Sequence, residues 1–457
     1  MEVIARKYGN PVFLNKQGKP AQLNERYWAA LYARLNDILY EPDEREFYLY
    51  DGSSGLFRII SVDFIRGQLD SLVRKLFPDY SRLATELNLR GVIAFLRTET
   101  EERDAFKNHG DFVHLANGIL KFDNGRFVLE DFSPSFLSRN QSPVSYDCDA
   151  EAPEFIEFLK PLCDDDKTLV RKYFGQLLFG RNITQTILLL DGESATGKST
   201  LTKIMRNIVG EQNCYELRTA LLADRFELGR YIGKTFLVAP DVDARFLSTQ
   251  GASLLKPLVG GDPLPAELKQ RNSRFTVPGV FNVVITSNCR LRVRLQGDNE
   301  AWRRRLLIVR YENTRNGRTI PDYDKVLVEK EGSGILNFAL RGLEDAWRDI
   351  AENGGRFKLA KIHNARVDKL LNESDSLRVF LKDSIAVEAR RDLTAAEILE
   401  QYYRDCIDEE LSPVPLSDAR KILDSLMMEL FGVSRSGSIL RDGKNQRGFS
   451  GVRFRND

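Results

Sequence analysis

Short, uninterrupted apolar runs mark the middle of the chain as a parallel β-sheet. Three runs, at residues 187–190, 234–243 and 281–288, each have strand length and each end in polar or glycine residues. Strands that are apolar on both sides are typical of a parallel sheet with both faces buried. The stretch after the first run, residues 199–209, has helical character and stops at Gly210. We therefore predict an α/β core over residues 181–320.

The pattern before this core predicts two smaller units. Residues 1–105 combine a strand-like run at 46–50 with an amphipathic stretch at 64–77, which indicates an N-terminal α+β domain. Residues 106–180 begin with short apolar runs separated by Asn-Gly turns, which predict a hairpin at 112–131. A polar linker is expected at 138–153, followed by helical spacing at 154–178 with one apolar face.

Helical patterns return after the core, near residues 323–351 and 375–410. We expect residues 321–375 to form a helical lid or connector and residues 376–457 to form a winged-helix-like domain. Its inward-facing residues would be Leu423, Leu426 and Leu430, and its Gly- and Arg-rich tail would present Lys444 and Arg447 to phosphates.

Composition narrows the class of protein. The 67 Lys and Arg residues nearly balance the 66 Asp and Glu residues, so nucleic acid must be contacted through local patches. No run reaches the roughly 18 apolar residues of a membrane span, and the first residues lack the apolar core of a secretory signal. We expect a soluble, cytoplasmic protein that does not bind membranes. Five scattered cysteines and three histidines make a zinc site or a disulfide framework improbable.

A phosphate-binding loop follows the first apolar run. Residues 192–199 read GESATGKS, which matches G-x-x-x-x-G-K-[ST] between a predicted strand and a predicted helix. In such a loop the backbone N–H groups surround nucleotide phosphates, Lys198 reaches the β- and γ-phosphates, and Ser199 holds Mg²⁺. An ordinary Gly-rich turn with an incidental lysine is the alternative. The expected ATP-binding residues are Gly192, Glu193, Ser194, Ala195, Thr196, Gly197, Lys198, Ser199 and Thr200.

Polar residues at the ends of the other runs complete this predicted site. Asp241 and Asp243 would position Mg²⁺ and the attacking water, with Asp241 as a metal ligand beside Ser199. Asn288 could orient water near the γ-phosphate, or could simply form a turn. Arg304 or Arg305 could reach a neighbouring subunit's nucleotide as an arginine finger, or could belong to a solvated basic run.

A candidate DNA-gripping element lies between the second and third runs. A hairpin is predicted from 264–268 and 273–277, with Lys269 and Arg271 at its tip, and Lys256 precedes it. Paired cations at a hairpin tip suit a pore loop that holds a phosphate backbone, although an exposed turn would look the same.

This order of motifs resembles the superfamily 3 helicases, in particular the phage- and poxvirus-type primase-helicase family. The resemblance extends to Asn117-Gly118-Ile119-Leu120 and residues 143–147 before the core, and to residues 399–406 and 443–454 after it. It implies an AAA+-like P-loop ATPase core in a hexameric ring. It also implies that Lys198 and Ser199 are the Walker A residues, that Asn288 is sensor 1, and that Lys269 or Arg271 grips DNA.

The chain departs from this family in two respects. The family's acidic strand often ends in two adjacent acids, whereas here Pro240 precedes Asp241. Asp241 then aligns with the second acid, which activates water, and Asp243 is the residue that could compensate for the missing Mg²⁺-coordinating acid. The N-terminal hundred residues are also too short for an archaeo-eukaryotic-type primase, so a separate primase or polymerase is a candidate partner.

The function expected from these features is that of an ATP- and Mg²⁺-dependent DNA helicase acting on single-stranded and forked DNA. Such a protein would serve a phage, a virus or a mobile element in a bacterial or host cytoplasm. Two alternatives stay open. One is an origin-binding initiator that uses ATP only to assemble, and the other is a chaperone-like remodeller that does not act on nucleic acid.

Overall fold

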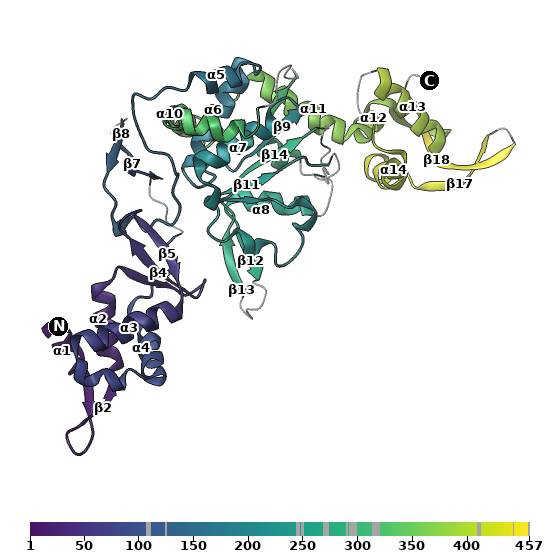
Figure 1. Ribbon diagram of the computed structural model, residues 1–457. Coiled ribbons are helices and arrows are strands. Elements are labelled where there is room, and N and C mark those ends of the chain that lie inside the picture. The colour runs from purple at the N-terminus through teal and green to yellow at the C-terminus, as the bar shows by residue number, and fades with distance from the viewer. Residues whose placement is uncertain are drawn as a thin grey trace.

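The chain forms an elongated mixed α/β molecule in this computed structural model, with the N-terminal unit at one end and the C-terminal unit beside the core (Figure 1). The structure describes residues 1–106, 111–123, 126–243, 247, 251–267, 274–288, 291, 299–312, 320–408, 413–441 and 443–455. None of the helices in these ranges has both the length and the apolar character needed to cross a bilayer.

The N-terminal unit packs its helices around one apolar cluster that includes Trp28, Leu69 and Leu96. It confirms the predicted strand at 46–50 and the predicted helix at 64–77. Its elements are α1 (Glu2–Tyr8), β1 (Val12–Leu14), β2 (Pro20–Leu23), α2 (Glu25–Leu35), β3 (Ile38–Glu41), β4 (Glu46–Asp51), β5 (Leu56–Ile60), α3 (Val62–Leu76) and α4 (Glu86–Glu99).

A three-stranded antiparallel sheet and two helices follow, where a hairpin and one helix were predicted. The single helix expected at 154–178 is wrong in one respect, because it is interrupted around Pro161, whose ring cannot continue a helix. The predicted linker at 138–153 has no helix or strand before Pro153, where a helix begins. It nevertheless packs on the core, for example through a hydrogen bond from Asn140 Nδ2 to the Gly233 carbonyl (2.8 Å). The elements are β6 (Phe112–Leu115), β7 (Gly118–Asp123), β8 (Arg126–Glu130), α5 (Pro153–Leu159) and α6 (Asp164–Leu178).

The core is a five-stranded parallel sheet in the order β10-β11-β14-β9-β15. The predicted hairpin pairs Leu264 with Val277. The strands are β9 (Ile187–Gly192), β10 (Cys214–Glu216), β11 (Phe236–Ala239), β14 (Asn282–Ser287) and β15 (Leu306–Tyr311), the hairpin is β12 (Pro263–Glu267) and β13 (Arg274–Pro278), and the helices are α7 (Lys198–Val209), α8 (Leu255–Gly260) and α9 (Asn299–Arg303).

Alternate residues of the core strands are buried on opposite faces of the sheet. Leu188 and Leu190 of β9 join a cluster with α6, α7 and α10 (Tyr323–Glu352), whereas Ile187 and Leu189 join one with α8 and α11 (Lys361–Ser374). A sheet covered on both faces explains why its strands read as unbroken apolar runs.

The C-terminal unit runs helix, strand, helix, helix, strand, strand, and its sheet order is β16-β18-β17. The uniformly helical prediction for 375–410 is wrong here, because Ile385 and the residues after it pair with β18. Leu423 and Leu426 are buried and Leu430 packs against them, as predicted. The elements are α12 (Ser376–Ser384), β16 (Ile385–Thr394), α13 (Ala395–Asp408), α14 (Leu416–Phe431), β17 (Arg435–Arg441) and β18 (Lys444–Phe454).

Two glycines let helices α6 and α10 cross with their backbones in contact. A Cβ on Gly342 would stand 1.9 Å from the Arg171 carbonyl oxygen, and a Cβ on Gly175 would stand 2.2 Å from the Leu343 nitrogen. Both contacts are far shorter than van der Waals separation, so any side chain must push the helices apart. The packing beneath the core sheet therefore depends on these two positions.

We predict that Gly342→Ala destabilises the protein by about 1–3 kcal/mol or more, since the added methyl overpacks this crossing. Gly67→Ala is the matched control, because Gly67 is also helical and has no atom within 4 Å of its Cβ position. The control should stabilise its helix by up to about 1 kcal/mol. Urea unfolding followed by circular dichroism measures both, and equal midpoints would contradict the crossing.

Candidate functional site

The glycine-rich loop joins the carboxyl end of β9 to the start of α7. Gly192 has φ 142°, and a Cβ there would lie 2.1 Å from the Tyr311 carbonyl oxygen of the neighbouring strand. Ala195 and Gly197 both have left-handed backbone angles, with φ 61° and 101°. The loop thus requires glycine at Gly192 for lack of space and favours it at Gly197 for its conformation.

Lys198 is folded back into this loop and is buried, with 4% of its surface exposed. Its ammonium donates hydrogen bonds to the carbonyls of Gly192 (2.7 Å) and Glu193, and to the Thr196 hydroxyl (3.2 Å). Burial lowers the pKa of Lys198, and the nearby carboxylates of Asp191 and Asp241 partly oppose this shift. An ammonium held only by neutral oxygens is placed to exchange them for an anionic ligand.

The other loop residues differ in accessibility. Thr196 is buried and donates to the Glu193 carbonyl (2.9 Å), so it braces the loop from inside. Ser199 is exposed in the first turn of α7, where free backbone N–H groups and the helix dipole favour an anion. Glu193, Ser194 and Ala195 are also exposed, and Thr200 is half-buried.

Asp241 stands at the end of β11, where Asn288 from the end of β14 contacts it directly. Asn288 Nδ2 donates to Asp241 Oδ1 (2.5 Å), and the Asp241 backbone N–H donates to the Thr286 hydroxyl (2.9 Å). Asp241 has a left-handed backbone, with φ 46°. The residue before it, Pro240, cannot donate an N–H to the sheet, so the chain leaves the strand here. Asp243 is exposed two residues farther on.

Two residues of this edge were not singled out from the sequence. Asp191 is the last side chain of β9 before the loop, and it lies in register with Ser287 of β14 and Arg310 of β15. Thr286 holds Asp241 in place through its hydroxyl and its carbonyl, which accepts from the Val242 N–H (2.8 Å). The carboxylate immediately before Gly192 is a signal that the sequence does offer, whereas the role of Thr286 depends on strand register.

Three cations, Lys256, Arg304 and Arg305, lie near one another at the end of α9. Arg305 is buried and donates to the Ala301 carbonyl (3.1 Å), whereas Arg304 is exposed and makes no ion pair with the described residues. Lys256 lies over the Trp302 ring, 5.0 Å from its centroid. Burial lowers the pKa of Lys256, and Arg305 and Arg304 lower it further. Of the two candidate fingers, Arg304 is therefore the one that faces solvent.

The predicted DNA contacts are only partly within the described residues. Lys269 and Arg271, at the tip of the β12–β13 hairpin, lie outside them. Lys444 and Arg447 are exposed on β18, and neither forms an ion pair within the described part of the C-terminal unit. Arg441 instead pairs with Asp392 (2.8 Å) and Glu397 (2.7 Å), so it serves the fold of that unit.

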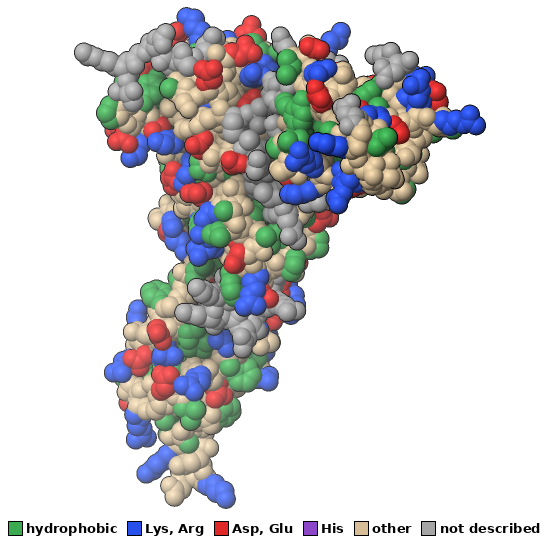
Figure 2. Space-filling view, turned by 90° about the vertical axis from the view of Figure 1, so that its right-hand side faces the viewer, with side chains coloured by type: hydrophobic (Ala, Val, Ile, Leu, Met, Phe, Trp, Pro, Cys, Tyr) green, Lys and Arg blue, Asp and Glu red, His purple; other side chains and the backbone are tan. Residues whose placement is uncertain are grey.

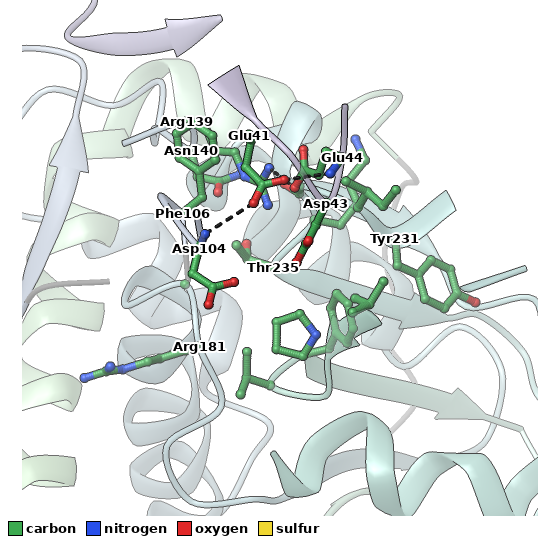
Figure 3. A pocket seen from close by; sticks show the side chains of 18 of the residues that line it. Glu41, Asp43, Glu44, Asp104, Phe106, Arg139, Asn140, Arg181, Tyr231 and Thr235 are labelled. Carbon is green, nitrogen blue, oxygen red and sulfur yellow. Dashed lines mark hydrogen bonds and ion pairs between the residues drawn. The ribbon is translucent and has the colours of Figure 1, made fainter. Parts of the chain in front are cut away.

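A separate cavity of about 190 Å³ lies between the N-terminal unit and the core, away from the loop (Figure 3). Glu41, Glu44 and Arg139 line it. Glu44 accepts from Arg139 (2.7 Å), and buried Glu41 accepts from the backbone N–H groups of Glu44 (2.6 Å) and Asp104 (3.2 Å). The Arg139–Glu44 bond joins the turn between β3 and β4 to the segment that follows β8, which itself packs on the core, whereas the two Glu41 bonds stay within the N-terminal unit.

The chain is similar to one protein family over part of its length and to two solved structures. Residues 190–305 match a family of unknown function, DUF5906, and the match spans the loop, Asp241, Asn288 and Arg304. Two solved structures of the NrS-1 C-terminal region are similar: one at 12% identity and TM-score 0.48, and one of residues 305–718 at 10% identity and TM-score 0.47. Each pairs 93% of this chain with 98% of the other.

Similarity at this level decides neither the activity nor the partners of this chain. No curated protein sequence matches it. The fold and the site define a mixed α/β protein with a parallel five-stranded sheet, whose carboxyl edge carries the loop, Asp241 and Asn288.

We predict that Asp241→Ala is less stable than Asp241→Gly by about 1 kcal/mol, since alanine resists the left-handed backbone that glycine adopts freely. Both variants delete the carboxylate, so their difference isolates the backbone conformation. Thermal unfolding of the two proteins measures it. An alanine variant as stable as the glycine variant would show that Asp241 is not held in this conformation.

Proposed function

We propose that this protein is an ATP-driven DNA helicase that works as a ring and moves along single-stranded DNA. The observation that carries the proposal is the meeting of three strand ends. One edge of the sheet carries Lys198 after β9, Asp241 after β11 and Asn288 after β14. Asp241 and Asn288 are in direct contact. A lysine, a carboxylate and an amide on one edge are the groups that ATP hydrolysis needs.

Each group has a definite task in the proposed reaction. The loop N–H groups and Lys198 would bind the β- and γ-phosphates, and the Ser199 hydroxyl and Asp241 would hold Mg²⁺. Asn288 and Asp241 would orient the attacking water, because their mutual hydrogen bond fixes both side chains beside the phosphate. Asp243 would compensate for the Mg²⁺-coordinating acid that the resembled helicases carry where this chain has Pro240. Bound Mg²⁺ would neutralise the charge that develops on the phosphates.

The neighbouring subunit would complete the site. Arg304 is exposed and has no ion pair among the described residues, so its guanidinium is available to a nucleotide outside its own chain. Arg305 is buried against its own helix and would instead hold α9 in place. This division of roles supports Arg304 as the finger. The hexameric ring itself comes from the family resemblance.

The DNA contacts would lie in the hairpin and in the C-terminal unit. The sequence puts Lys269 and Arg271 at the tip of the β12–β13 hairpin, and the cation Lys256 precedes this hairpin in the chain. The order of helices and strands in residues 376–455 is compatible with a winged helix, with α14 as the recognition helix and β17–β18 as the wing. Lys444 and Arg447 on that wing would contact phosphates.

An origin-binding initiator is the second candidate, and the same exposed cations on β18 favour it. Such a protein would hold duplex DNA through its C-terminal unit and use ATP only to assemble. It would hydrolyse ATP slowly and would displace no strand, which separates it from a helicase.

Lys198→Ala should reduce ATP hydrolysis by at least about 100-fold, because the variant loses the charge that stabilises the transferring phosphoryl group. Lys203→Ala, on the exposed face of the same helix, is the control and should keep the wild-type rate. Phosphate release measures both. Circular dichroism checks that the folds agree. Hydrolysis that survives in Lys198→Ala would remove the loop from the active site.

The Arg304→Ala variant should also hydrolyse ATP more slowly, by about 10³-fold or more, although its phosphate-binding loop is intact. Mixing Arg304→Ala with Lys198→Ala should restore part of the activity, because mixed rings contain interfaces where an intact loop faces an intact Arg304. Arg303→Ala is the control, since Arg303 pairs with Asp368 within its own chain (2.9 Å). Mixtures that stay inactive would place Arg304 outside the shared site.

A further inference from the structure

We propose that the β1–β2 hairpin of the N-terminal unit is a second nucleic-acid-binding element. In this element Lys16 and Lys19 contact backbone phosphates, and Phe13 stacks on a base of a single-stranded segment. The hairpin lies at the end of the molecule farthest from the C-terminal unit (Figure 1), and none of its residues takes part in the proposed ATPase site. The inference therefore goes beyond the proposed function and does not depend on ATP hydrolysis.

The base of the hairpin is fixed rigidly to the helices of the N-terminal unit. The Pro11 carbonyl accepts from the Asn24 backbone N–H (2.9 Å) and from the Trp28 indole (2.9 Å). Val12 and Leu23 pair across the strands and are buried in the apolar cluster of this unit. The hairpin is thus an ordered projection and not a loose loop.

Its turn is also closed by specific hydrogen bonds. Asn15 Oδ1 accepts from the backbone N–H groups of Gln17 (2.9 Å) and Lys19 (3.0 Å), and the Asn15 carbonyl accepts from the Gly18 N–H (2.9 Å). Gly18 takes the positive φ of 74° that this turn requires. The two lysines are therefore presented from a defined turn, which lowers the entropy lost when they bind phosphates.

Two apolar side chains next to the turn are exposed. The strand register shifts between Phe13 and Leu14, and Phe13 is 51% exposed and Leu14 is 59% exposed. Both residues directly precede the basic turn. An exposed aromatic ring beside cations is the combination that holds a single strand, since every base offers a face for stacking.

The charge of the hairpin selects a polyanion as the partner. Residues 10–23 contain Lys16 and Lys19 and no carboxylate, although the whole chain is nearly neutral. Both lysines are exposed, and neither forms an ion pair within the described residues. Figure 2 shows Lys and Arg side chains standing out at the lower tip of the molecule. The exposed Phe13 and Leu14 alone would also suit a protein partner. A protein partner would not explain why the only charged residues of the hairpin are lysines.

Binding of a labelled oligothymidylate to the full chain, without nucleotide, tests the inference. Each phosphate contact to a single strand contributes about 0.7 to the slope of log affinity against log salt concentration. Lys16→Gln with Lys19→Gln should therefore weaken binding and make that slope shallower by about 1.4. The control is Lys160→Gln with Lys325→Gln, which removes two exposed charges, one just after α5 and one in α10, far from the hairpin.

A tryptophan introduced at the hairpin reports separately on base stacking through its fluorescence. Phe13→Trp should lose fluorescence when the oligothymidylate binds, because a stacked base quenches the indole. Ile59→Trp, at an exposed position of β5, should not respond. A hairpin variant that binds with the same salt slope as the control pair would overturn the inference, and so would a Phe13→Trp signal unaffected by the oligonucleotide. Neither readout requires ATP hydrolysis, so failure of the proposed helicase activity would leave both interpretable.

Discussion

Parallel pairing of β9 with β14 on one side and β15 on the other is the constraint on which the site depends. Because the strands run in one direction, every segment that leaves a carboxyl end leaves at the same edge. The loop, Asp241 and Asn288 meet there although almost a hundred positions of the chain separate Gly192 from Asn288. The close approach of Gly192 to the Tyr311 carbonyl shows how tightly β15 closes the other side of the loop.

The loop is held closed by its own lysine. Buried Lys198 satisfies its three donors on oxygens of the loop, while two carboxylates lie close enough to affect its pKa. A phosphate offers more negative oxygens at the same place, so the proposed nucleotide binding would exchange these bonds for charge-assisted ones at a lysine that is already buried. The same residue thus links the stability of the empty loop to the proposed chemistry.

The sequence was sufficient for β9, β11, β14 and the loop, because these follow from short apolar runs and one local motif, whereas β10 and β15 were not predicted. It was insufficient where distant residues decide the structure. The strand β16 lies in a stretch with helical spacing and forms because β18 pairs with it. The bracing role of Thr286 and the choice between Arg304 and Arg305 depend on register and burial, which no local pattern encodes.

ATP-dependent strand displacement on forked DNA, with 3′ and 5′ single-stranded tails tested in turn, distinguishes a helicase from an initiator. We expect that one tail polarity supports displacement in the presence of ATP and Mg²⁺, and that the Lys198→Ala protein displaces nothing. If the wild-type protein hydrolyses ATP but displaces neither fork, the proposed helicase function is wrong and the origin-binding initiator is the better description.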